Sequence, residues 1–219
     1  MALSMDILMY FEYCIMFLFK IKFKKTNLLF GFLLLLSKIV IILLIMISEN
    51  IKLRALEPSD VQLLFEWEND LSIWHLSNTI APFSKFDLEQ YILNSDKDIY
   101  SSKQMRLMID KKISNSKFQT IGNIDIFDFD PLNKRAGIGI LIIEKERNKG
   151  LASEALDLLI KYGFETLNLH QFYCNISSEN EVSIKLFKKK NFQIIGIKKD
   201  WNYRNGKYSD EYLMQLINE

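Results

Sequence analysis

The sequence predicts an α/β domain that begins near residue 46 of the 219-residue chain. Several runs before residue 144 alternate apolar and polar residues with a period of two, which is typical of strands. The apolar period then changes to 3.6 after Gly150, which indicates a helix. Hydrophobic residues make up 49% of the chain and charged residues 25%, a balance that allows a sizeable core.

The first half of the domain is expected to hold one strand, two helices and three further strands. Residues 51–56 alternate, and Pro58 then presets a helix start that Ser59 or Asp60 can cap. The apolar face of this helix is expected to comprise Val61, Leu64, Phe65 and Leu71. A second helix follows over residues 84–94, and β-like runs follow over residues 105–109, 120–129 and 135–143. The polar turn at residues 130–133 predicts a hairpin between the last two.

The second half of the domain is expected to begin with a helix from Leu151 to about Leu167. A strand at residues 172–176 and a helix at residues 179–190 come next. Residues 192–199 and 208–217 then form two strands around the turn Asn205-Gly206. The predicted order is therefore β-α-α-β-β-β-α-β-α-β-β.

The first 48 residues differ from the rest in composition. Residues 27–47 are apolar except for Lys38 and a few small or polar positions, and the run is long enough to span a bilayer. One interpretation is a membrane anchor, whose upstream lysines would stay in the cytosol and place the domain across the membrane. The other is a translated AT-rich upstream stretch, with the functional chain beginning at Met46. We favour the second, with residues 1–48 as a hydrophobic extension and residues 49–219 as the domain.

Charge and cysteine content exclude some classes of function. The 28 basic and 27 acidic residues leave a net charge of only +1, without the basic excess of nucleic-acid-binding proteins. Cys14 and Cys174 lie far apart and form no CxxC motif, so we expect neither a disulfide framework nor a metal site. Two free cysteines suit a reducing compartment, which predicts a cytoplasmic location.

Residues 144–153 link a predicted strand to a predicted helix. The first backbone N–H groups of a helix have no partner within it, and the helix dipole favours an anion beyond that end. Gly150 lets the backbone approach a phosphate closely, and Ala152 adds little bulk. Arg147 and Lys149 add positive charge, and Ser153 offers a hydroxyl group. This loop therefore predicts an anion site at the start of the helix.

Two motifs resemble those of the GCN5-related N-acetyltransferase (GNAT) family. Arg147-x-x-Gly150-x-Ala152 is similar to its acetyl-CoA signature, Gln/Arg-x-x-Gly-x-Gly/Ala, between the fourth strand and the third helix. Asn180-x-x-Ser183, followed by Asn191-Phe192, is similar to its later helix and the entry to the next strand. The resemblance runs from residue 51 to the end. It implies the GNAT fold, a mixed and mostly antiparallel sheet flanked by helices and splayed between strands four and five.

The same resemblance implies acetyl-CoA as co-substrate and a set of residues that bind it. The strand would place Leu141, Ile142 and Ile143 beside the pantetheine arm, and three residues of the later helix would face the CoA: Asn180, Ser183 and Phe187. The loop and first helical turn would bind the pyrophosphate through Arg147, Asn148, Lys149, Gly150, Leu151, Ala152 and Ser153.

Residues 53–60 and the closing hairpin resemble the spermidine/diamine and ribosomal-protein acetyltransferase branches of the family. This likeness implies acetyl transfer to a primary amine. We favour a polyamine or diamine as the acceptor, with a protein N-terminal amine as the alternative, and a homo-oligomer is an expected assembly.

Acetyl transfer needs a base that takes a proton from the amine and an acid that protonates the leaving thiolate. Asp125, in Gly122-x-x-Asp125, resembles the Gly-x-x-Glu of the spermidine enzymes and is a candidate base or substrate ligand, unless it is a solvated strand residue. In many relatives a tyrosine seven residues after the position of Asn180 acts as the general acid, but in this chain that position is Phe187. Three tyrosines are candidate substitutes, namely Tyr162, Tyr173 and Tyr203. Phe187 also leaves open a non-catalytic acyl-CoA-binding module. Glu66, Glu68 and Asp70 form an acidic strip on the first helix, which could attract a polyamine, but we interpret it as a solvent-exposed helix face.

Overall fold

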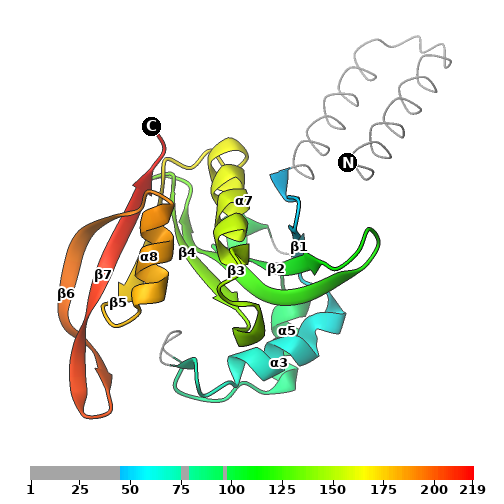
Figure 1. Ribbon diagram of the computed structural model, residues 1–219, viewed down its shortest axis with the longest axis horizontal. Coiled ribbons are helices and arrows are strands. Elements are labelled where there is room, and N and C mark those ends of the chain that lie inside the picture. The colour runs from blue at the N-terminus through cyan, green and yellow to red at the C-terminus, as the bar shows by residue number, and fades with distance from the viewer. Residues whose placement is uncertain (1–44, 75–78, 96–97) are drawn as a thin grey trace, which may run out of the picture.

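The computed structural model describes residues 45–74, 79–95 and 98–219. Within them, one seven-stranded sheet runs in the order β1-β2-β3-β4-β5-β7-β6 (Figure 1). Neighbouring strands are antiparallel except β4 and β5, which are parallel, so the predicted mixed sheet is confirmed. The strands are β1 (Ile51–Ala55), β2 (Met105–Lys112), β3 (Phe118–Asp130), β4 (Arg135–Ile142), β5 (Gln171–Ser177), β6 (Gln193–Arg204) and β7 (Lys207–Ile217).

Helices cover both faces of this sheet (Figure 1). On one face, α7 (Leu151–Glu165) and α8 (Glu181–Lys189) bury Leu156 and Ile184 among side chains of β3, β4 and β5. On the other, α3 (Val61–Glu68) and α5 (Lys85–Leu93) pack Leu64 and Leu88 around Met108 of β2. Three short turns of helix complete the fold, η1 (Pro58–Asp60), α6 (Ile99–Ser102) and η2 (Glu144–Glu146).

The strands β4 and β5 pair only at one end. Their register joins Arg135–Gly137 to Gln171–Tyr173 and stops there, although β4 continues to Ile142 and β5 to Ser177. Beyond Gly137 the two strands therefore separate and leave a seam in the sheet. This is the splay that the resemblance implied between strands four and five.

Local sequence explains the ends of several elements. The Ser84 hydroxyl accepts the N–H of Asp87 and the Asp87 carboxylate accepts the Ser84 N–H, which fixes the start of α5. Asn205 and Gly206 have φ of 49° and 79°, the left-handed values that a two-residue hairpin turn needs. The predicted turns at residues 130–133 and 205–206 are both confirmed.

The structure differs from the sequence-based expectation in several places. α3 ends at Glu68, where the Asn69 side chain bonds the carbonyl of Phe65, so Leu71 lies outside the helix and is 73% exposed. β6 extends to Arg204 rather than residue 199, because it pairs with β7 up to the hairpin turn. The turn of helix α6 was not predicted, since a single turn has too few residues to show a period.

Most of the hydrophobic extension, residues 1–44, lies outside the described residues, and with it most of the apolar run at residues 27–47. Among the helices that the structure does describe, none has the length and apolar content needed to cross a bilayer.

Candidate active site

A cavity of about 550 Å³ occupies the seam between β4 and β5. Its walls include the consecutive residues 138–141 of β4 and 174–177 of β5. Successive side chains of a strand point to opposite faces of the sheet, so this cavity is lined from both faces. We call it the seam cavity. It joins the side covered by α7 and α8 to the side covered by α3 and α5.

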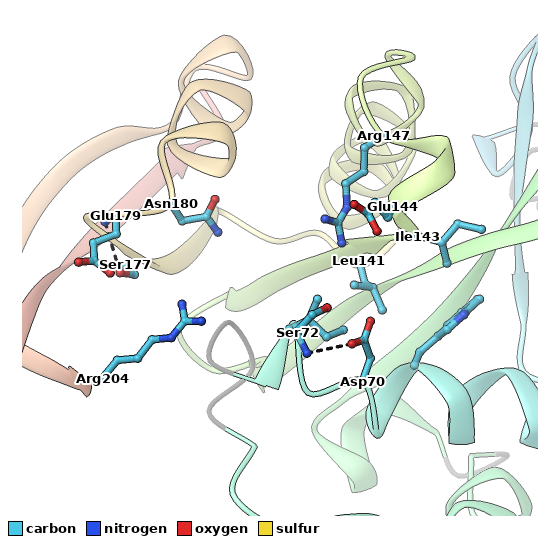
Figure 2. A pocket seen from close by; sticks show the side chains of 12 residues that line it. Asp70, Ser72, Leu141, Ile143, Glu144, Arg147, Ser177, Glu179, Asn180 and Arg204 are labelled. Carbon is cyan, nitrogen blue, oxygen red and sulfur yellow. Dashed lines mark hydrogen bonds between the residues drawn. The ribbon is translucent and has the colours of Figure 1, made fainter. Parts of the chain in front are cut away.

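A second cavity, of about 490 Å³, adjoins the first, since Trp67, Leu141 and Asn180 line both. We call it the outer cavity. Figure 2 shows Arg147 and Asn180 on either side of it, with Leu141 below Arg147 and Arg204 reaching in from the end of β6. The lining thus combines the ends of β4, β5 and β6 with the loop before α7 and the start of α8.

The start of α7 is open. Its N-cap residue is Gly150, with φ of 79°, and no side chain caps the first turn. The acidic residue of that turn, Glu154, bonds Asn50 instead. Backbone N–H groups at the helix start are therefore left for an anion, and a glycine without a side chain stands before them.

The basic residues of the loop have different partners. Arg147 lines the outer cavity and donates from Nε to the carbonyl of Ile142 at 2.9 Å, which orients its guanidinium. The Lys149 ammonium bonds the carbonyl of Lys145 and the carboxylate of Glu146, which Lys111 also contacts. Glu146 thus neutralises the Lys149 ammonium group, whereas the Arg147 guanidinium faces the outer cavity.

The remaining predicted loop and strand residues occupy several environments. Leu141 and Ile143 line the outer cavity, whereas Ile142 and Leu151 are buried in the core beneath it. Asn148 has φ of 60°, which helps the chain turn toward α7. Ala152 and Ser153 are half-buried in the first turn. Residues 148–153 lie outside the lining of both cavities.

The start of α8 faces Arg147 across the seam. The side-chain Oδ1 of Asn180 accepts the N–H of Ser183 at 3.1 Å, and Figure 2 shows the side-chain nitrogen turned toward the outer cavity. Ser183 and Phe187 line the seam cavity one and two turns further along. The Phe187 ring packs edge-on against Phe192, with centroids 5.0 Å apart, and offers no proton.

On the other side of the seam, Arg106 of β2 holds two carboxylates at the cavity wall. It donates to both oxygens of Asp125, at 2.8 and 3.0 Å, and to Glu68 at the end of α3. The Tyr91 ring lies beneath the guanidinium, 5.5 Å from it. Burial opposes the charge of Arg106, but Asp125 and Glu68 raise its pKa overall. The cluster therefore carries one net negative charge. Glu68 is part of it, so its assignment to a solvent-exposed face was wrong.

The three tyrosines considered as substitutes for the acid lie elsewhere. The Tyr173 hydroxyl donates to Asp128, and burial together with Asp128 raises its pKa to about 12. Burial also raises the pKa of Tyr162, and Tyr203 is 67% exposed beside Tyr208. No tyrosine of the described residues lines either cavity. The one thiol in the seam cavity, Cys174, stays protonated because burial raises its pKa to about 12.

The fold brings together Leu141, Asn180, Ser183, Phe187 and Asp125 around the seam cavity, although they are distant in sequence. Sequence reasoning did not identify Arg106, Glu68 or Asn123 as site residues. Asn123 lines the same cavity, and its alternation with Asp125 along β3 was the available signal. Nothing in the sequence around Arg106 or Glu68 distinguishes them from ordinary surface charges.

Comparisons with known proteins agree with this geometry. Residues 50–193 match the family model of the acetyltransferase (GNAT) domain. The chain is 30% identical over 171 residues to the uncharacterized N-acetyltransferase p20 of Bacillus licheniformis, covering 78% of this chain and 94% of that one. It is 26% identical over 173 residues to the spermidine N(1)-acetyltransferase of Escherichia coli K12, covering 78% and 87%.

Among solved structures, the fold is similar to that of the spermidine N-acetyltransferase of Vibrio cholerae in complex with CoA and spermine. The TM-score is 0.67 at 23% identity, over 76% of this chain and 95% of that chain. The family match spans the open start of α7 and both strands of the seam. The chain belongs to the GNAT acetyltransferase family, and it is an acyltransferase whose co-substrate is acetyl-CoA.

Proposed function

We propose that this protein transfers the acetyl group of acetyl-CoA to a primary amine, and that a polyamine or diamine is the favoured acceptor. The observation that carries the proposal is the seam cavity, which is lined from both faces of the sheet. Such an opening lets a thioester enter from the α7 and α8 side and an amine from the α3 and α5 side. The two reactants would then meet within the sheet, where their orientation accelerates the reaction.

On the co-substrate side, the pyrophosphate would lie at the start of α7, beside Gly150 and Arg147. The absence of a capping side chain and the left-handed φ of Gly150 support this position. Leu141 and Ile143 would line the path of the pantetheine arm, with Asn180 and Ser183 on the opposite wall. The seam between β4 and β5 would guide the arm toward Asp125.

In the reaction, the lone pair of a neutral amine attacks the thioester carbonyl, an N–C bond forms, and the C–S bond breaks. Sulfur leaves as a thiolate and nitrogen loses one proton. We assign proton acceptance to Asp125, directly or through a water molecule, because it is the carboxylate that β3 presents at the cavity wall. Phe187 supplies no acid, so the thiolate would be protonated by solvent.

Acidic side chains near the cavities support a cationic acceptor. The cluster of Glu68, Arg106 and Asp125, on the amine side of the seam cavity, has a net negative charge. The named spermidine acetyltransferases among the relatives support the same class of substrate. A protein N-terminal amine is the alternative acceptor. Phe187 in place of an acid favours a second candidate, a module that binds acyl-CoA without turnover.

We also propose that the protein forms a homo-oligomer through the edge strand β6. Exposed apolar side chains gather on β6 and its hairpin, including Ile195, Ile197, Trp201, Tyr203 and Tyr208, all at least 52% exposed. An exposed apolar edge strand is a template for pairing with another chain. A dodecameric structure of the Vibrio cholerae spermidine N-acetyltransferase supports assembly in this family. Size-exclusion chromatography with light scattering tests this proposal.

We place the enzyme in the cytoplasm, with residues 49–219 as the catalytic domain and residues 1–48 as an extension. The supply of acetyl-CoA supports this location, and an anchor formed by residues 27–47 is the alternative. Fractionation of cells that express the full chain distinguishes the two, because an anchored protein sediments with membranes.

The experiment that tests the function is thiol release from acetyl-CoA by the full chain, measured against a panel of polyamines, diamines, amino acids and short peptides. We expect turnover that saturates with one or more primary amines and is fastest with polyamines or diamines. A preference for peptides would favour the N-terminal acceptor. Acetyl-CoA binding without release of thiol with any amine would instead identify a non-catalytic module.

A further inference from the structure

Asn123 is a buried polar residue without a partner. It is 3% exposed, and its side chain makes no hydrogen bond in the described part of the chain. The other buried polar residues of the described chain are all carboxylates, and each forms an ion pair: Asp60 and Asp110 with Arg54, Glu146 with Lys111, and Glu211 with Lys198. A buried amide without a partner is costly, so natural proteins keep one where something else satisfies it.

The Asn123 amide opens onto the seam cavity. No fully enclosed side-chain nitrogen or oxygen of the described residues lacks a hydrogen-bond partner. The unpaired amide of Asn123 must therefore reach accessible space, and the space it borders is the seam cavity. A group that enters this cavity finds one acceptor and two donors ready to bond.

The register of the sheet defines what lies on either side of this amide. On β4, Asn123 stands opposite Leu141, which lines both cavities, and on β2 it stands opposite Met108. Asp125 follows two residues later on the same face. Asn123 thus lies between the strand proposed to guide the thioester and the carboxylate proposed to accept the proton.

We propose that Asn123 positions the acceptor amine. Its Oδ1 accepts one N–H of the neutral amine, and this turns the nitrogen lone pair toward the thioester carbonyl. The inference rests on the proposed function and adds a binding residue for the substrate.

The chemistry favours an amide over a carboxylate at this position. A carboxylate beside the nitrogen stabilises the ammonium form, which has no lone pair with which to attack. A neutral carbonyl oxygen accepts an N–H with less preference for the charged form. Asn123 can therefore hold the amine while Asp125, fixed by Arg106, takes the proton.

Two variants of the full chain test the proposal, with kcat, KM and their pH dependence as readouts. Asn123→Leu keeps the branched shape of the side chain, although it is larger, and cannot bond the amine, so we expect KM for the amine to rise at least tenfold. Asn123→Asp keeps an acceptor oxygen but favours the ammonium ion, so the acid limb of the kcat profile should move up by about one pH unit. The acetyl-CoA Kd and the Tm of each variant report whether the fold is intact.

A wild-type KM in Asn123→Leu together with an unshifted profile in Asn123→Asp overturns the inference and leaves the proposed function standing. If Asn123→Leu does not fold, the profile of Asn123→Asp decides alone. Absence of turnover by the wild-type chain with every amine overturns the proposed function and this inference together.

Discussion

Two arginines on neighbouring strands are each held between two carboxylates, in arrangements that look alike. Arg54 of β1 bonds Asp60 of η1 at 2.7 and 2.8 Å and Asp110 of β2 at 2.9 Å. Arg106 of β2 bonds Glu68 of α3 and Asp125 of β3. In both clusters one acid comes from the first helical segment and the other from the next strand of the sheet.

The clusters differ in what surrounds the acids. Asp60 also accepts the N–H of Glu57, Asp110 also accepts the hydroxyl of Thr120, and their side chains are 4% and 7% exposed. Glu68 and Asp125 are 19% and 24% exposed and line the seam cavity. The first cluster is closed and joins the helix to the sheet, whereas the second leaves its acids open to a substrate. Whether a salt bridge stabilises the fold or serves a binding site therefore depends on whether its carboxylates are buried or border a cavity.

The largest expected effect is on stability. Arg54→Leu leaves the buried Asp60 without a counter-charge and Asp110 with Lys52 alone, at 3.6 Å, and we expect a loss of about 3 kcal/mol in the free energy of unfolding. Arg106→Leu should cost less, because water in the cavity can solvate Glu68 and Asp125. Urea denaturation of both variants measures the difference. Equal losses in the two variants would remove the distinction between a closed and an open cluster.

The open cluster should instead control activity. Asp125→Asn removes the proposed base without changing the shape of the side chain, and we expect kcat to fall about 100-fold. The variant also loses one of the two bonds to Arg106, so Tm should fall and activity is measured well below it. Asp128→Asn is the matched control, because Asp128 lies on the same strand but bonds Tyr173 outside both cavities. Thiol-release assays compare them. An equal effect of the two substitutions would argue against Asp125 as base.

A smaller gain in rate is expected from adding an acid across the seam cavity from the open cluster. Phe187→Tyr places a hydroxyl in the wall of the seam cavity, and we expect kcat to rise by about tenfold or less, since a thiolate is already a good leaving group. Phe192→Tyr changes the ring that packs against Phe187 but lines neither cavity, and serves as control. A Phe187→Tyr enzyme no faster than wild type would mean that protonation of the thiolate does not limit turnover.

The smallest expected effect is on the pH dependence of stability. Burial favours the neutral form of Asp60, but hydrogen bonds from Arg54 and from the Glu57 N–H lower its pKa below the usual 3.8. The carboxylate therefore stabilises the fold above that pH, and this contribution is lost as the pH falls through the lower native value. Asp60→Asn should be less stable than wild type at pH 7, and the gap should narrow at pH 3. Urea denaturation at both pH values checks this, and a constant gap would contradict it.

The sequence alone predicted the order of the elements, because alternation, helical period and turn residues such as Asn205-Gly206 are local signals. The open start of α7 was also predictable, since the glycine that begins it, Gly150, is a local signal. The two arginine clusters were not. Each joins residues far apart in the chain, and a pattern of charges along one helix does not reveal that Glu68 meets Arg106 of another strand.

The role of Asn123 in the site could be predicted only in part from the sequence. Alternation put it on the same face as Asp125, but only the packing around β3 shows that its amide is buried without a partner. The family resemblance likewise showed that Phe187 occupies the position where many relatives carry the tyrosine that acts as general acid. It could not say whether another proton donor lay nearby, and the structure finds no tyrosine of the described residues in either cavity.

The most direct test of the account is acetyl-CoA binding to a matched pair of glycine variants, measured by isothermal titration calorimetry on the full chain. Gly150 and Gly206 both have φ of 79° and open space where a Cβ would stand, so alanine strains the backbone equally at each. We predict that Gly150→Ala weakens acetyl-CoA binding at least tenfold, because its methyl group meets the pyrophosphate, and that Gly206→Ala binds like wild type. Equal affinities in the two variants, or no binding by the wild-type chain, would contradict acetyl-CoA binding at the start of α7.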